Sequence, residues 1–273
     1  MTMNEPVFTL ERGSTPLLLS LPHVGTTMPD ELAPAFEPRA LALEDTDWHL
    51  AEVYGFARNL GASVLVPRFS RYVIDLNRPP ENAPMYPGAN NTELVPTRFF
   101  SGDPLYRQGR VPDAAEIDRR RETYWRPYHD ALAAELARLV AVHGHAVLWD
   151  GHSIQAELPW LFEGRLPDLN LGTAGGTSCA PTLRADVMDV LAAQSSFSHV
   201  TDGRFKGGYI TRHYGRPHDR VHAIQLEMAL STYMDPRYAA FPVAPVDPML
   251  FAHLRPVLQS LLQATLDWCH DGD

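Results

Sequence analysis

The stretch Val147-Leu-Trp-Asp-Gly-His-Ser153 places three apolar residues directly before an acid, a glycine, a histidine and a hydroxyl. The apolar residues, with the two before them, are predicted to form a buried strand over His145–Trp149. Such a strand carries a carboxylate and an imidazole to the edge of a sheet. Ligands of open α/β sheets bind at the carboxyl ends of the strands. The stretch therefore predicts a functional site at the end of a central strand.

Two other apolar runs also lead into residues with reactive side chains. Residues 16–22 are predicted to form a strand that ends at His23, and residues 221–226 a strand followed by Glu227. Because sites in α/β sheets lie at strand ends, we expect these two side chains and His152 to contribute to one site.

The remaining pattern alternates between helices and strands. Residues 79–112, rich in Pro, Gly and Asn, are predicted to be a long loop, which in a compact domain is usually functional or packed over a site. The alternation predicts an α/β protein with a sheet covered on both faces. Nothing divides the chain, so residues 1–273 are predicted to form a single domain. Helices are predicted at 47–60, 113–144 (kinked or split at Pro127), 182–193 and 250–268, and further strands at 63–67, 72–76 (as a possible hairpin), 169–171 and 199–201.

Composition excludes some classes of protein. The chain has 273 residues, of which 45% are hydrophobic, and a net charge of −10. It has no basic stripe of the kind typical of a nucleic-acid binder. No apolar run approaches the ~18 residues of a membrane span, and no signal peptide is evident. We therefore expect a cytoplasmic protein. Cys179 and Cys269 have no metal-ligand spacing and are predicted to be buried thiols.

Two histidines and one carboxylate can hold a catalytic zinc ion when a fourth position remains open for water. His23, His152 and one of the acidic pair Asp45 and Asp47 offer such a set. Their spacing in the sequence is long and is not diagnostic. A second interpretation therefore stays open, in which the histidines are hydrogen-bonded loop residues and the aspartates cap a helix.

Glu227 and the arginines also allow two interpretations. A carboxylate at the end of an apolar strand must be paired, coordinated or catalytic, so Glu227 is either a general base beside a zinc site or half of a buried ion pair. Clustered guanidinium groups suggest a small anion bound at fixed points. The alternative is surface ion pairs worth about 0–1 kcal/mol each. The clusters are Arg68, Arg71 and Arg78 beside Asn77, and Lys206, Arg212, Arg216 and Arg220.

Longer motifs between about residue 16 and residue 235 carry a family resemblance. They include LPHVGTTMP, DTDWHLAEVYGFA, SRYVIDLNRPP, RRRETYWRPYHDAL, WDGHSI, GRFKGGYITRHYGRP and HAIQLEMALSTYMD. Together they resemble the N-formylglutamate amidohydrolase (N-formylglutamate deformylase) family of bacterial histidine degradation. The resemblance implies a three-layer α/β/α fold with a central mostly parallel or mixed sheet, similar to the zinc carboxypeptidases and of the phosphorylase/hydrolase-like type.

The resemblance also implies one zinc ion per chain, with another divalent metal as an alternative. The ligands that it implies are His23, Asp47 and His152. In relatives the acidic ligand precedes a helix, and counting back from Val53-Tyr54 places it at Asp47. Counting from the preceding Glu-Asp pair places it instead at Asp45.

The family's reaction implies roles for the remaining site residues. Glu227 would be the general base for hydrolysis of N-formyl-L-glutamate to formate and L-glutamate. Arg71, Asn77 and Arg78 would bind one carboxylate of this small dianionic substrate, and Arg212 the other. Two other functions remain open: a related zinc amidohydrolase or peptidase that acts on a different N-acyl acidic amino acid, and a binding protein that has lost its metal.

Overall fold

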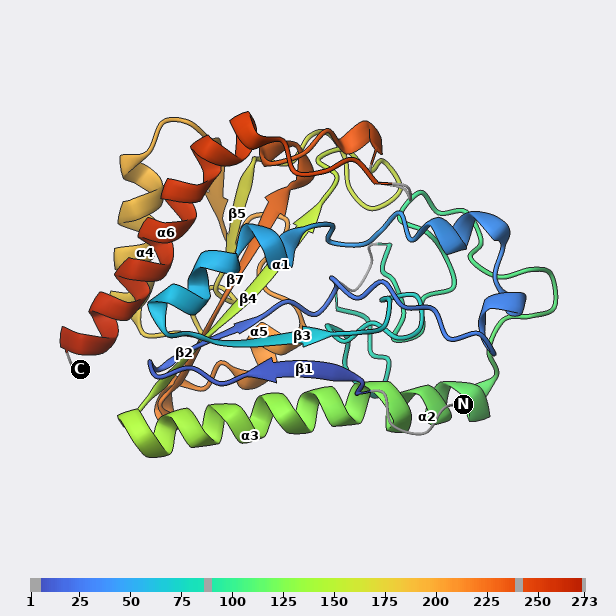
Figure 1. The fold of residues 1–273 in the computed structure, drawn as a ribbon, viewed down its shortest axis with the longest axis horizontal. Helices are drawn as coiled ribbons and strands as arrows, with labels where there is room; N and C mark the ends of the chain where they lie inside the picture. Colours follow the sequence, from blue (N-terminus) through green and yellow to red (C-terminus); the bar gives the residue numbers. More distant parts are fainter. Residues whose placement is uncertain (1–5, 86–89, 239–242, 272–273) are drawn as a thin grey trace.

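The computed structural model describes residues 6–85, 90–238 and 243–271. Within these ranges, the strands form one mixed sheet in the order β1-β3-β2-β4-β7-β5-β6 (Figure 1). The strands are β1 (Phe8–Glu11), β2 (Leu17–Ser20), β3 (Ser63–Pro67), β4 (Ala146–Ile154), β5 (Leu169–Gly172), β6 (His199–Thr201) and β7 (Val221–Ala229). The α-helices are α1 (Leu50–Val53), α2 (Ala114–Arg120), α3 (Arg126–His143), α4 (Pro181–Ala193), α5 (Tyr209–Tyr214) and α6 (Pro248–Asp271).

The centre of the sheet is parallel. Strands β3, β2, β4 and β7 run in the same direction, whereas β1 and β5 are antiparallel to their inner neighbours. The carboxyl ends of β2, β4 and β7 therefore lie at one edge. Strands β4 and β7 pair over nine residues, and this pairing sets His152 directly beside Glu227.

Helices cover both faces of the sheet. On one face, Trp149 of β4 donates a hydrogen bond to the Tyr54 hydroxyl at the end of α1, and the ring of His222 on β7 lies 4.7 Å from that of Trp268 on α6. On the opposite face, Asp150 of β4 accepts from Thr211 of α5. Helix α3 packs against β2 and β4, and Figure 1 shows it on the side of the sheet away from α4 and α6. The expected three-layer α/β/α arrangement with a mixed sheet is confirmed.

The long helical pattern after residue 112 is split, as the proline predicted. Asp113 caps α2 by accepting a hydrogen bond from the Glu116 amide. A π-helical turn, Arg121–Trp125, then leads into α3, where Pro127 occupies the first turn and needs no intrahelical donor. Gly144 ends α3 in the left-handed conformation, with φ of 86°.

Strands β4 and β7 are longer than predicted. The sequence indicated that they end at Trp149 and Leu226, because polar residues follow. The structure continues both strands, to Ile154 and Ala229, and buries every residue of β4. Each strand provides the hydrogen-bonding partner that the other needs, so the backbone pairing extends past the apolar residues.

The predicted strand 72–76, and the hairpin it would form with 63–67, is wrong. This segment is a series of turns: Ser70 accepts from the Val73 amide through its carbonyl, and the Asp75 carboxylate accepts from the Asn77 amide. Its apolar residues are buried, so their pattern reflects packing rather than strand pairing.

The predicted helix 47–60 is present only in part. Helix α1 has four residues, and a 3₁₀ helix, Gly55–Leu60, follows it. Glycine is a poor helix former, which favours a break at this position. The edge strand β1 was not predicted, because only four half-buried or exposed residues mark it.

The other predicted elements are present, with small shifts at their ends. The described parts of 79–112 contain no helix or strand; residues 86–89 of this predicted loop lie outside the described ranges. None of the helices in the described ranges has the length and apolar character needed to cross a membrane.

We expect the buried face of β4 to contribute strongly to stability. Leu148 is 0% exposed and lies between Leu18 of β2 and Ala223 of β7. Leu148→Ala should therefore lower the free energy of unfolding by about 2–5 kcal/mol, as measured by urea denaturation. Val142→Ala, at a position that is 63% exposed, is the control and should change it by less than ~0.5 kcal/mol. Equal effects of the two substitutions would contradict this account of the core.

Candidate metal centre and active-site cavity

Three buried side chains converge at the carboxyl edge of the parallel strands. They are His23, which follows β2, Asp47, which precedes α1, and His152 of β4. The Nδ1 atoms of His23 and His152 are 3.2 Å apart, and Asp47 Oδ2 lies 3.8 Å from the first and 3.4 Å from the second. One possible ligand atom from each residue thus lies within 4.8 Å of the other two.

Backbone contacts hold these residues together. The Asp47 amide donates to the His23 carbonyl at 3.1 Å, which ties the loop before α1 to the segment after β2. The Ser153 amide of β4 donates to Asp47 Oδ2 at 3.2 Å. His152 and Asp150 project from the same face of β4, because alternate side chains of a strand point the same way.

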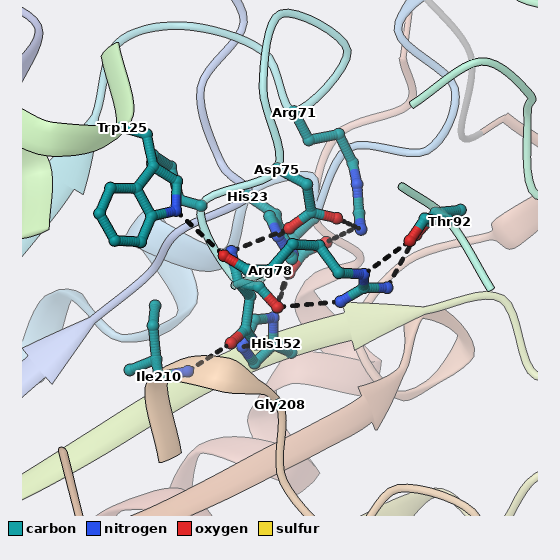
Figure 2. Close-up of polar contacts among 12 residues, drawn as sticks. His23, Arg71, Asp75, Arg78, Thr92, Trp125, His152, Gly208 and Ile210 are labelled. Atoms are coloured by element: carbon teal, nitrogen blue, oxygen red, sulfur yellow. Dashed lines mark hydrogen bonds and ion pairs between the residues drawn. The ribbon is translucent and has the colours of Figure 1, made fainter. Parts of the chain in front are cut away.

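The outer nitrogen of each histidine faces a carboxylate. His23 Nε2 lies 2.7 Å from Asp75 Oδ1, and His152 Nε2 lies 3.0 Å from Asp150 Oδ1 (Figure 2 shows both rings and Asp75). His23 can donate its Nε2 proton to Asp75 and so present an unprotonated Nδ1 as a metal ligand. The two Nδ1 atoms face each other, and Asp47 Oδ1 is buried without a hydrogen-bond partner. These residues fit a divalent metal ion.

Asn77 lies against the same imidazole. Its Oδ1 accepts from the Ile210 amide at 2.8 Å, so its Nδ2 points toward His152 Nε2, 3.0 Å away. Asp150 Oδ1 lies 3.0 Å from the same nitrogen but has no hydrogen-bond partner, so the contact between Asp150 and His152 is electrostatic. Asn77 therefore packs beside the ring and fixes its orientation.

The electrostatic field of the group favours a cation. Burial alone would lower the pKa of His152, but the Asp150 and Asp47 carboxylates raise it well above the usual value. Burial and the Arg71 guanidinium lower the pKa of His23. The two histidines thus differ in their charge environment, because the Arg71 guanidinium opposes the effect of the carboxylates on His23.

Asp45 does not join the two histidines. Its Oδ2 accepts hydrogen bonds from the Tyr72 hydroxyl at 2.8 Å and from the Phe100 amide at 3.0 Å. Burial raises the pKa of Asp45 to about 6. Asp45 thus links the segments of Tyr72 and Phe100 near the site. Of the two aspartates, only Asp47 belongs to the metal-binding group among the described residues.

A cavity opens beside the three ligands. It exposes the metal-binding histidines together with a carboxylate, three guanidinium groups and several aromatic and aliphatic side chains. The lining residues are His23, Arg71, Asn77, Arg78, Asn90, Asn91, Thr92, Phe100, His152, Ser153, Ile154, Leu161, Arg204, Phe205, Gly208, Gln225 and Glu227.

Glu227 lies on the wall of this cavity. Its Cα pairs with that of His152 in the neighbouring strand, so both side chains leave the same face of the sheet. Gln225, two residues earlier, places its Nε2 3.4 Å from Glu227 Oε2. Burial raises the pKa of the Glu227 carboxyl above its ordinary value. The sequence left open whether Glu227 is a general base or half of a buried ion pair. Among the described residues, the structure shows no ion pair between Glu227 and an arginine.

The two arginines nearest the ligands have different partners. Arg78 donates to the carbonyl and hydroxyl of Thr92, at 3.0 and 2.7 Å, and to the Asn77 carbonyl at 3.0 Å (Figure 2). Arg71 instead donates to Asp75 Oδ2 at 2.7 Å, and its guanidinium lies over the ring of Phe100. The positive charge of Arg71 is thus balanced by a carboxylate, whereas Arg78 is held by neutral acceptors.

Arg212 does not line the cavity. It is exposed on α5, and its Nε donates to the Gly207 carbonyl at 2.8 Å. Arg204, from the segment between β6 and α5, lines the cavity instead. Arg204 was missed because it lies two residues before the predicted cluster, and the sequence carries no signal of which way each arginine points.

Asp75 and Gln225 were also missed as site residues. Asp75 had been placed within a predicted strand, although it lies only two residues before the Asn-Arg pair. Gln225 precedes Glu227 by two residues, and the period of a strand is the signal that both face the same side.

Comparisons with known proteins find relatives over nearly the whole chain. Residues 15–234 match a family model described as N-formylglutamate amidohydrolase. A Pseudomonas aeruginosa protein named N-formylglutamate deformylase is 49% identical over 258 residues, which cover 94% of this chain and 97% of that protein. A Pseudomonas putida protein of the same name is 45% identical, with 97% of each chain covered.

Solved structures share the fold. The crystal structure of N-formylglutamate amidohydrolase from Ralstonia eutropha JMP134 superposes with a TM-score of 0.76 at 26% identity, and covers 96% of this chain and 97% of its own. An Agrobacterium tumefaciens gene product has the same fold, with a TM-score of 0.73 at 18% identity and 97% of each chain covered. The extent of the family match and the identity to the two Pseudomonas proteins show that this chain belongs to the N-formylglutamate amidohydrolase family.

Proposed function

We propose that this chain is a zinc-dependent N-formylglutamate deformylase, which converts N-formyl-L-glutamate and water to formate and L-glutamate. The observation that carries the proposal is one cavity lined by His23, His152, the Glu227 carboxylate and the Arg78 guanidinium, with Asp47 close to both histidines. The names of the two Pseudomonas relatives support the choice of substrate.

Zinc is the metal that suits this donor set. Two imidazoles and one carboxylate are typical protein ligands of catalytic zinc, which keeps a further position for water or substrate. When bound, the ion supplies Lewis acidity, which polarises a carbonyl oxygen and makes water a stronger acid. Asp75 and Asp150 hold the two rings so that their Nδ1 atoms point toward the shared position.

Glu227 is the proton carrier in the proposed reaction. It accepts a proton from the attacking water at its carboxylate, and later donates that proton to the glutamate nitrogen as the formyl C–N bond breaks. One water is thereby divided between formate and the free amine. Glu227 pairs with the metal-binding residue His152 across the two strands, but it is not one of the three proposed ligands.

Arg78 and Arg71 have separate tasks in the proposed site. Arg78, whose hydrogen bonds within the described ranges all go to neutral acceptors, binds a substrate carboxylate through charge-assisted hydrogen bonds. Arg71, anchored by Asp75, supplies fixed positive charge beside the ligands and stabilises negative charge that develops on the formyl oxygen. Asn77 assists by holding the His152 ring.

The first test concerns the metal. Purified protein should contain about one equivalent of zinc, and a chelator should abolish turnover. Asp47→Asn removes a ligand, and we expect it to reduce the zinc content measured by mass spectrometry to a small fraction of one equivalent. Asp45→Asn is the matched control and should retain zinc, because Asp45 binds Tyr72 and Phe100 instead. Zinc loss confined to Asp45→Asn would overturn the ligand assignment.

The second test concerns the base. Glu227→Gln removes the proton acceptor and keeps the size of the side chain. It should lower kcat roughly 10²–10⁴-fold, while the zinc content and the melting temperature stay near those of the wild type. Glu163→Gln, at an exposed position, serves as the control. A lower melting temperature with a nearly unchanged kcat would show that Glu227 is structural.

The third test concerns the substrate. The loss of one charge-assisted hydrogen bond costs about 1.5–3 kcal/mol, so N-formyl-L-glutamate should exceed N-formyl-L-leucine in kcat/KM by at least about tenfold. N-acetyl-L-glutamate, which has the same two carboxylates and a larger acyl group, completes the panel. Faster hydrolysis of the acetyl compound would identify a related amidohydrolase of different acyl specificity.

A further inference from the structure

We propose that Arg204 binds the side-chain carboxylate of the substrate and that Arg78 binds its α-carboxylate. The cavity would then recognise a dianion at two separate points. This inference rests on the proposed function and adds to it the residue that distinguishes glutamate from neutral side chains.

Arg78 belongs to the end of the cavity where the chemistry takes place. Its guanidinium donates to the Asn77 carbonyl, and the Asn77 side chain lies 3.0 Å from the ring of the metal-binding His152. The α-carboxylate of an N-formyl amino acid is separated from the scissile nitrogen by only one carbon. Arg78 is connected to the metal-binding His152 through Asn77 alone. Its guanidinium is therefore suited to bind the α-carboxylate.

Arg204 reaches the cavity from a different part of the chain. It is half-buried in the segment between β6 and α5, where its Nη2 donates to the Leu161 carbonyl at 3.1 Å. The guanidinium carbon lies 5.4 Å from the centroid of the Phe205 ring. These two contacts hold the side chain at the wall of the cavity that Leu161 and Phe205 also line.

The two arginines are attached to segments that meet at the cavity. Arg78 is fastened to Thr92, and Asn90 in the same segment donates through its side chain to the Trp160 carbonyl at 2.6 Å. Trp160 precedes Leu161, the residue that accepts from Arg204. Both guanidinium groups are thus placed by one continuous set of contacts around the cavity.

The lining of the cavity also matches the chain between the two carboxylates. Phe100, Ile154, Leu161 and Phe205 provide apolar surface beside the charged residues. The side chain of glutamate has two methylene groups before its carboxylate. Apolar walls favour burial of these methylenes, and an arginine beyond them supplies the paired donors that a carboxylate accepts.

The structure places Arg204, rather than Arg212, where this role requires a cation. Arg212 had been predicted for the second carboxylate, but it is exposed on α5 and lies outside the lining of the cavity. Lys206, also in the segment of Arg204, is exposed and outside the lining as well. Lys206 therefore provides a control at which one positive charge is removed from the same segment.

The test compares an acidic substrate with its neutral isostere. N-formyl-L-glutamate and N-formyl-L-glutamine have nearly the same size and differ in the charge of the side chain. Arg204→Gln should lower kcat/KM roughly tenfold to a hundredfold for the glutamate compound, mainly through KM, and by less than about threefold for the glutamine compound. Arg78→Gln should lower both, since both substrates carry the α-carboxylate. Lys206→Gln should leave both nearly unchanged.

Binding of the products tests the same assignment without turnover. Calorimetry with the zinc-loaded protein should show that Arg204→Gln weakens binding of L-glutamate much more than that of L-glutamine. If neither formyl compound is hydrolysed but this selective weakening appears, the proposed reaction fails and the subsite stands. Equal losses for the acidic and neutral ligands, or no loss, would overturn the role of Arg204 even if the wild-type enzyme hydrolyses N-formyl-L-glutamate.

Discussion

Two carboxylate–imidazole contacts fix the geometry on which the candidate site depends. Asp75 faces Nε2 of His23 at 2.7 Å, and Asp150 faces Nε2 of His152 at 3.0 Å. The first is a hydrogen bond, through which His23 can donate Nε2–H and present a lone pair on Nδ1 to the metal position. The second places a negative charge beside the His152 ring. Buried carboxylates need partners of their own, and Arg71 serves Asp75 as one such partner. The site therefore extends well beyond its three ligands.

The long pairing of β4 with β7 provides the frame for these contacts. It sets Asp150 and Gln225 level with the last residue of β2 and carries His152 and Glu227 past it. All four lie on one face, because alternate residues in paired strands share a side. Helix α5 then closes over this face, with Thr211 donating to Asp150 and the Ile210 amide donating to Asn77. A ligand set built on paired strands has little freedom to move, which suits a centre that must hold a metal in one geometry.

Local sequence patterns predicted the elements that are governed by local interactions. Apolar runs predicted the central strands. Pro127 predicted the split in the long helix, and Gly144 predicted its end. Predictions failed where a tertiary contact overrode the local pattern. Residues 72–76 are apolar because they pack in the core, and no neighbouring strand was placed to pair with them. Strand β4 continues through polar residues because β7 pairs with it.

The sequence by itself determined the α/β class, the family and most of the residues that carry the chemistry, because apolar periodicity and residue type are local properties. Tertiary structure decided which atoms meet. It brought Asp47 rather than Asp45 to the histidines, engaged Arg71 with Asp75, and turned Arg204 rather than Arg212 toward the cavity. Each of these choices depends on contacts between residues far apart in the chain, and neither spacing nor composition specifies the direction in which a loop side chain points.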